Sequence, residues 1–164
     1  MNSLKEIKSF IQDTKYFCLG TSDTEGNVWT APMTYVADDN LNIYFHSALD
    51  SVHIENIKEN PAVSFSIYDS NQMLSEIDGL QGKGIIGQID NREIDEVYRK
   101  FFIKHIPNDE IRAQFAPPIA SFSGDDFPQK RFFKMKINEL YKKNIEIYNV
   151  ARRQKVELQE LMKE

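Results

Sequence analysis

Residues 26–67 read GNVWTAPMTYVADDNLNIYFHSALDSVHIENIKENPAVSFSI, and their pattern of apolar and polar side chains carries most of the information about the fold. Residues 28–36 are rich in β-branched and aromatic side chains, which favour a strand. The polar turn at 38–40 leads into a second strand-like run at 41–47. Because this connection has the length of a hairpin turn, we expect the two strands to be antiparallel neighbours.

A short helix and a further strand follow in the same stretch. Residues 51–60 place apolar side chains at helical spacing, and Pro61 ends the helix. Apolar and polar side chains alternate in residues 62–69, which is typical of a strand with one buried face. Before the stretch, residues 16–22 are strand-like and reach the next strand through a turn at 24–27, so we expect three consecutive neighbouring strands.

The rest of the chain is interpreted from the same patterns. Ser3 and Glu6 have the spacing of a capping box at the start of an amphipathic helix. The other elements that we expect are a helix at 3–13, a glycine-marked strand at 79–89, a helix at 91–106, an irregular stretch at 107–129, a strand at 130–140, a turn at 141–144, a strand at 145–150 and a helix-prone tail from Val150. About six or seven antiparallel strands with peripheral helices indicate a small barrel or sandwich.

Length and composition indicate one soluble domain over residues 1–164. The hydrophobic share of 41% fits a packed core, and the formal charge of -5 argues against a general nucleic-acid binder. We find no signal peptide and no apolar stretch near the ~20 residues of a membrane span, so we expect a cytoplasmic protein without a membrane partner. The single cysteine, Cys18, lies in the apolar run YFCLG, which predicts a buried and inert thiol.

Two serines and two histidines gather in YFHSALDSVHIENI, residues 44–57, where a strand ends and a helix begins. Helix capping accounts for them in one way, because Ser and Asp are favoured N-cap residues. An anion site accounts for them in another, because a helix N-terminus presents unpaired N–H groups and the positive end of the helix dipole. The residues by themselves leave both interpretations open.

No motif indicates catalysis by the side chains of the protein itself. GLQGKG at 79–84 lacks the spacing of a phosphate-binding loop, and one cysteine cannot form a paired-cysteine zinc site. The three histidines are too scattered for a metal triad, so we expect no metal and can name no catalytic residue. If the protein is an enzyme, an acquired cofactor would carry the chemistry.

The order of elements in residues 26–67 resembles the FMN-binding split-barrel superfamily, the pyridoxamine 5'-phosphate oxidase-like proteins. The resemblance rests on a glycine-containing hairpin, a strand with a proline in its middle, an acidic turn, a strand that ends in Tyr-Phe and polar residues, and a helix that ends in Asn-Pro before a Val-rich strand. It continues through GLQGKGII, YRKFFIKHIP and RFFKMKINEL and covers about residues 5–150. The insert at 107–128 is most similar to that of a bacterial subfamily.

This resemblance implies a mainly β fold with α-helices, a split barrel of about six antiparallel strands, which forms a homodimer with two FMN molecules at the subunit interface. The strand that begins at Trp29 would line the isoalloxazine ring largely through its backbone. Ser51 and His53 fall on the family's Ser-x-Lys motif at the phosphate, and Gln81 would reach the ring from the partner subunit. The implied cofactor-binding residues are Trp29, Thr30, Ala31, Pro32, Met33, Thr34, His46, Ser47, Ser51, His53 and Gln81.

Two features depart from the family pattern. His53 stands in place of the family's phosphate-binding lysine, and the strand from Trp29 to Tyr35 has no basic residue. Because histidine titrates near neutrality, we expect phosphate binding to be weaker or more pH-dependent than with lysine. Simpler roles stay open for two of the residues, since Trp29 can be a core aromatic and Gln81 can satisfy neighbouring backbone groups.

The resemblance implies a flavoprotein oxidoreductase whose FMN exchanges hydride or electrons with a nicotinamide cofactor or a small conjugated substrate. A second hypothesis is a flavin carrier or sensor without turnover. A third places haem or another planar ligand in the same cleft, with His46, His53 or His105 as an axial ligand. The sequence does not identify the substrate, the direction of the reaction or the choice between NADH and NADPH.

Overall fold

The computed structural model describes residues 3–72, 79–125, 128–144 and 152–163. In these residues eight strands form one antiparallel sheet in the order β2-β1-β5-β6-β7-β4-β3, with β8 beside β7. The strands are β1 (Tyr16–Ser22), β2 (Val28–Thr34), β3 (Val36–Ala37), β4 (Ile43–Ala48), β5 (Ala62–Tyr68), β6 (Gly79–Gln88), β7 (Lys130–Asn144) and β8 (Arg152–Val156). The helices are α1 (Leu4–Asp13), α2 (Val52–Glu59), α3 (Ile94–His105), α4 (Asp109–Phe115) and α5 (Leu158–Leu161), with 3-10 turns η1 (Asn91–Glu93) and η2 (Ile119–Phe122).

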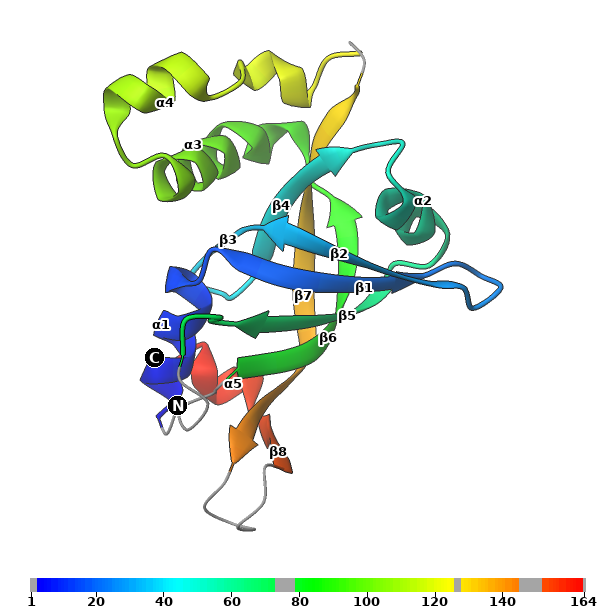
Figure 1. Cartoon of the computed structure of the whole chain (residues 1–164), viewed down its shortest axis with the longest axis vertical. Coiled ribbons are helices and arrows are strands. Elements are labelled where there is room, and N and C mark those ends of the chain that lie inside the picture. The colour runs from blue at the N-terminus through cyan, green and yellow to red at the C-terminus, as the bar shows by residue number, and fades with distance from the viewer. Residues whose placement is uncertain (1–2, 73–78, 126–127, 145–151, 164) are drawn as a thin grey trace.

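The two ends of the sheet are neighbours in the chain. β2 ends at Thr34 and β3 begins at Val36, so a single residue, Tyr35, joins the first and last strands of the sheet. The sheet must therefore curl until these strands approach each other, and Figure 1 shows β1 and β2 crossing in front of the long strand β7. The expected fold class, mainly β with α-helices in a split barrel, is confirmed.

The expected hairpin between residues 28–36 and 41–47 is wrong for most of its length. Only Val36 and Ala37 pair with β4, while β2 pairs with β1 and the other side of β4 pairs with β7. Tyr35 marks the break, because its ring is buried and its hydroxyl donates a hydrogen bond to the carbonyl of Ile11. The chain leaves one edge of the sheet at this residue and joins the other.

Several expected elements are confirmed at the level of single contacts. Ser3 and Glu6 form the capping box of α1, which buries Ile7 and Ile11. β5 alternates buried and exposed side chains along its length. Close approach of another backbone at the glycines of β6 is also confirmed, since a Cβ on Gly82 would lie 2.3 Å from the carbonyl oxygen of Glu139.

Other expectations were wrong in the second half of the chain. The stretch at 107–129 contains α4, whose N-cap Asn108 accepts a hydrogen bond from the backbone N–H of Ile111. Residues 141–144 continue β7 and do not form a turn. The helix-prone tail contains β8, which pairs with the end of β7, before the short helix α5. The strand expected at 145–150 lies outside the described residues.

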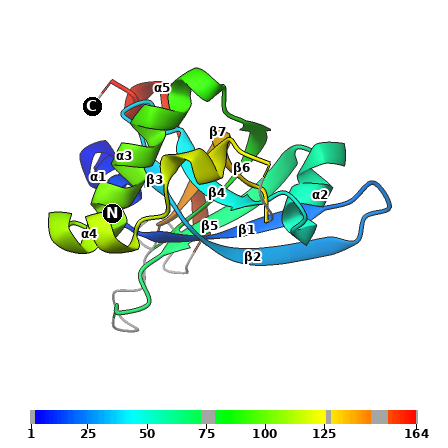
Figure 2. The ribbon, with the colours of Figure 1, turned by 90° about the horizontal axis from the view of Figure 1, so that it is seen from above.

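Two apolar clusters lie on opposite faces of β4 and β7. The larger one fills the barrel and includes Phe17, Phe45 and Phe133, with α1, α2 and α5 packed against it. The smaller one lies outside the barrel, where α3 and η2 cover Tyr44 and Phe132. Figure 2 shows α1 and α5 toward one end of the molecule and α2 with the β1–β2 turn at the other. Because successive strand residues face opposite sides, the direction of each side chain on β4 decides which cluster it joins.

Candidate functional site

Three of the expected phosphate residues lie together where β4 meets α2. Ser47 lies near the end of β4, Ser51 is the N-cap residue of α2, and His53 lies in its first turn. The Oγ of Ser47 is 2.8 Å from Nε2 of His53 and 3.1 Å from Oγ of Ser51. Ser51 Oγ is also 3.3 Å from the same imidazole nitrogen. We call Ser47, Ser51 and His53 the polar trio.

The capping interpretation of Ser51 is wrong for its side chain. The hydroxyl of Ser51 makes no hydrogen bond to the first turn of α2 and donates instead to the carbonyl of Ala48, at 2.8 Å. An N-cap serine normally turns its oxygen toward the N–H of the second or third helical residue. The N-terminus of α2 therefore lies beside two hydroxyls and an imidazole, without a cap from the side chain of Ser51.

The hydrogen bonds of the polar trio fit one arrangement of protons. Since Ser51 gives its proton to Ala48, its oxygen can only accept, and Ser47 is its available hydroxyl donor. Ser47 then accepts from His53, which requires a proton on Nε2 of the imidazole. A bound anion would take these protons from their present acceptors, because each of the three groups can turn its proton toward the anion instead.

The charge on His53 is sensitive to pH. Partial burial lowers the pKa of His53 below its usual value, so the free imidazole is neutral at pH 7. An anion at the polar trio would favour the charged form and raise this pKa again. Anion binding should therefore bring a proton with it, which links affinity to pH.

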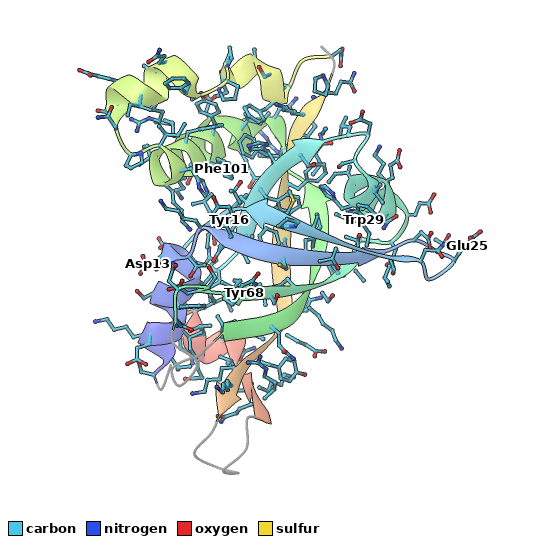
Figure 3. The ribbon with its side chains drawn as sticks, viewed as in Figure 1. Asp13, Tyr16, Glu25, Trp29, Tyr68 and Phe101 are labelled. Carbon is cyan, nitrogen blue, oxygen red and sulfur yellow. The ribbon has the colours of Figure 1, made fainter. Side chains whose placement is uncertain are left out.

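Strand β2 lies at one end of the strand order, so within the described chain no other strand pairs with one of its edges. Trp29, Ala31 and Met33 pair with Thr21, Leu19 and Phe17 of β1, whose side chains are buried. Thr30, Pro32 and Thr34 therefore point to the opposite face of the sheet. Trp29 is 48% exposed and lies at the end of β2 that is near α2 (Figure 3).

His46 is separated from the polar trio, although it precedes Ser47 in the chain. Its ring packs against four phenylalanines of the smaller apolar cluster, at centroid distances of 4.9 to 6.1 Å, and these are Phe101, Phe102, Phe122 and Phe132. Burial, with smaller effects of Lys130 and His105, lowers the pKa of His46 to about 4. The structure therefore does not bring His46 to the site where the resemblance placed it, and the two imidazoles lie on opposite faces of β4.

A comparison with protein families identifies the relatives of this chain. The model described as pyridoxamine 5'-phosphate oxidase matches residues 3–144. The chain belongs to the pyridoxamine 5'-phosphate oxidase family.

Several solved structures share the fold of this chain, although their sequence identity to it is low. The conserved hypothetical protein Rv2991 from Mycobacterium tuberculosis is 16% identical with a TM-score of 0.70, and the match covers 87% of this chain and 84% of that one. The haem storage protein HutZ from Vibrio cholerae is 18% identical with a TM-score of 0.61, covering 83% and 91%. A haem binding protein from Mycobacterium smegmatis is 12% identical with a TM-score of 0.68, covering 99% and 61%. No curated protein matches the sequence.

Gln81 lies far from the polar trio along the sheet. It pairs with Tyr141 on β7, whereas Ser47 pairs with Arg131, ten positions away along that strand. At ~3.3 Å per residue these ten positions correspond to roughly 30 Å along β7. Gln81 lines a cavity of about 380 Å³ together with Lys143 and Arg153. A ligand at the polar trio can therefore meet Gln81 only if a second copy of the chain supplies it.

The expectation of a buried Cys18 is wrong. The thiol is partly exposed and lies 3.9 Å from the hydroxyl of Tyr68, in the wall of a cavity of about 890 Å³. The alternation in β1 could have indicated this, because Phe17 and Leu19 take the buried face and leave Cys18 on the other.

In the described residues no group of three or more His, Cys, Asp and Glu side chains could hold a metal ion. None of the helices in the described part of the chain combines the length and the apolar character that a membrane span needs.

Proposed function

We propose that this pyridoxamine 5'-phosphate oxidase family member binds FMN at the interface of a homodimer and acts as an oxidoreductase. The observation that carries the proposal is the polar trio at the N-terminus of α2. Two hydroxyls and an imidazole converge within 3.3 Å of one another beside the positive end of a helix dipole. This set of donors fits a phosphate, which accepts several hydrogen bonds and is stabilised at helix N-termini.

In this proposal the two serines of the polar trio donate hydrogen bonds and the histidine supplies positive charge. Ser47 and Ser51 donate their hydroxyl protons to phosphate oxygens, and the N–H groups of the first turn of α2 add backbone donors. His53 supplies positive charge after it takes up a proton, which a lysine at this position would supply at any physiological pH. The phosphate therefore anchors the cofactor.

The open edge of β2 would orient the ring system. Backbone N–H and C=O groups along this edge have no neighbouring strand in the described residues and can bond to the polar edge of an isoalloxazine ring. Trp29, Thr30, Ala31, Pro32, Met33 and Thr34 are the residues that would line it. Trp29 is half exposed and can stack on a planar ligand, whereas Ala31 lies in the core and contributes through its backbone.

A homodimer would complete the site. The roughly 30 Å along β7 between Gln81 and the polar trio means that Gln81 of the partner subunit would approach the cofactor. Val28 and Ile85 are exposed apolar side chains on the outer face of the sheet, 82% and 43% accessible, which a partner would cover. FMN, when bound, supplies hydride or single-electron transfer, with a nicotinamide as the proposed electron donor.

The histidines support flavin over haem as the ligand. Nε2 of His105 is 3.0 Å from the carbonyl oxygen of Tyr35, and its ring packs on Phe101 at 4.5 Å. His46 lies among phenylalanines, and Nε2 of His53 is engaged with Ser47. An axial ligand needs a free imidazole nitrogen facing an open cleft. A haem iron would therefore have to use Nδ1 of His53 or His105, or displace the ring of His46 from among the phenylalanines.

The absorption spectrum tests the proposal. Protein purified from cells supplied with riboflavin should carry the flavin absorption bands, and NADH or NADPH should bleach them under anaerobic conditions. Bands without bleaching by either nicotinamide would indicate a flavin carrier or sensor. A haem spectrum, or no flavin after saturation with FMN, would contradict the proposed function.

A further inference from the structure

A cavity at the other end of the molecule lies away from the polar trio. It measures about 890 Å³ and opens between the C-terminal part of α1, the start of β1 and the end of β5. Figure 3 shows Asp13, Tyr16 and Tyr68 at this end of the molecule, whereas Trp29 lies toward α2. A volume of this size is in the range of small-molecule sites.

Aromatic groups form much of the cavity wall. Tyr16 and Tyr68 line it and remain 62% and 53% exposed, and Phe10 and Phe17 lie between them and the barrel core. Large rings with free faces are costly to leave in water, and they bind planar or aliphatic groups well. The cavity is therefore suited to an organic ligand.

The charged side chains around the cavity favour a ligand with a positive charge. Glu6, Asp13 and Asp69 line it, and Lys15 is the one basic side chain among the described lining residues. Asp13 accepts a hydrogen bond from the hydroxyl of Ser9, and Asp69 accepts one from the backbone N–H of Asn71. Both donors are neutral. The ammonium group of Lys104 donates a hydrogen bond to the carbonyl of Thr14 and interacts with the charge of Asp13. The three carboxylates therefore outnumber the two nearby cations, Lys15 and Lys104. Tyrosine faces also attract cations through the ring quadrupole.

We propose that this cavity binds a small organic cation with an aromatic or aliphatic body, such as a primary amine, and that it is a second site, separate from the polar trio. The ammonium group lies near Asp13 and Asp69, and the apolar body lies against Tyr16 and Tyr68. The phosphate of FMN would be repelled by the same carboxylates. Pro32 lines this cavity and also belongs to the strand proposed to line the flavin ring, so the two sites adjoin at β2. The inference does not depend on the proposed flavin function.

Three matched probes test the choice of ligand. They are 2-(2-naphthyl)ethylamine, 2-(2-naphthyl)ethanol and 3-(2-naphthyl)propanoate, which share a ring system and differ in charge. Calorimetry on the unmodified protein should show the amine binding about tenfold more tightly than the alcohol, with the carboxylate weakest. Equal affinity for the three probes, or no binding of the amine, would overturn the proposal.

Cys18 reports whether the amine occupies this cavity. It is the only cysteine in the sequence, so the rate of alkylation by iodoacetamide, followed by intact mass, refers to one position. The amine should slow alkylation in proportion to its measured occupancy. Binding of the amine with an unchanged alkylation rate would place it elsewhere and contradict the proposal. This measurement needs no variant, so it holds even if a substitution impairs folding.

A pair of variants separates the local charge from the net charge. Asp13→Asn keeps an oxygen acceptor for Ser9 and should weaken amine binding about threefold or more while leaving alcohol binding unchanged. Glu25→Gln makes the same change of charge in the exposed β1–β2 turn, at the far end of the molecule (Figure 3), and should have no effect. Equal effects of the two variants would mean that the amine responds to the overall charge of the protein.

Discussion

His46 and Ser47 are adjacent in the chain and lie in opposite environments. His46 faces the phenylalanine cluster under α3, where burial lowers its pKa to about 4. Ser47 faces the other side of β4 and joins Ser51 and His53 at the start of α2. Side chains alternate between the two faces of a strand, and this alternation separates His46 from Ser47. His46 therefore contributes to packing, whereas His53, beside Ser47, is available for an anion.

The largest expected difference concerns stability. Phe122→Ala removes a fully buried ring from the cluster around His46 and should lower the free energy of unfolding by about 3–5 kcal/mol. Phe115→Ala is the matched control, because Phe115 is 66% exposed, and it should change stability by less than ~0.5 kcal/mol. Urea unfolding followed by circular dichroism measures both. Similar losses would mean that the cluster does not hold α3 and η2 on the sheet.

The next largest expected effect is the loss of stability at low pH that His46 causes. The folded-state pKa of His46 is below the usual 6.5, so the unfolded chain takes up the proton first as the pH falls. The stability from neutral His46 is fully present above pH 6.5 and is lost toward pH 4, by roughly 3 kcal/mol. His46→Phe should reduce the loss of stability between these pH values by about that amount. Carboxylates titrate equally in both proteins, so a variant with the parent's pH dependence would contradict this assignment.

A smaller effect is expected on the other face of β4. Ser47→Ala removes one donor of the polar trio and should reduce FMN affinity about threefold to tenfold, with a change in stability below ~1 kcal/mol. Ser123→Ala, at an exposed position beyond η2, is the control and should leave affinity unchanged. Fluorescence titration with FMN measures both variants. An unchanged affinity in Ser47→Ala would remove Ser47 from the phosphate site.

The sequence allowed local elements to be predicted where local interactions determine them. The capping box of Ser3 and Glu6 and the alternation of residues 62–69 involve near neighbours, and both are confirmed. α4 is only seven residues long and carries just Ile111 and Phe115 at helical spacing, which is too short a pattern to indicate a helix between prolines. β8 was read as helical because its charged residues favour helices, whereas pairing with β7 and the burial of Val156 hold it as a strand.

The candidate site could be predicted in part. The polar trio follows from the order of residues around the start of α2, and its members meet through contacts of at most six positions in sequence. The alternation along β4 directs the side chain of His46 away from that of Ser47, and its ring packs in the smaller apolar cluster. The break at Tyr35 and the distance of Gln81 depend on contacts between remote parts of the sheet, which a local pattern does not reveal.

The relative affinity for FMN and riboflavin tests the role of the polar trio most directly, because only FMN carries the phosphate. We predict that the protein prefers FMN by about tenfold or more at pH 6, as a charge-assisted contact is worth roughly 1.5–3 kcal/mol. The preference should be smaller at pH 8, since burial lowers the pKa of free His53 and proton uptake then opposes binding. His53→Ala should reduce the preference and flatten its pH dependence, and His53→Lys should keep the preference at both pH values. Equal affinity of the native protein for FMN and riboflavin at pH 6 and pH 8 would contradict the phosphate site.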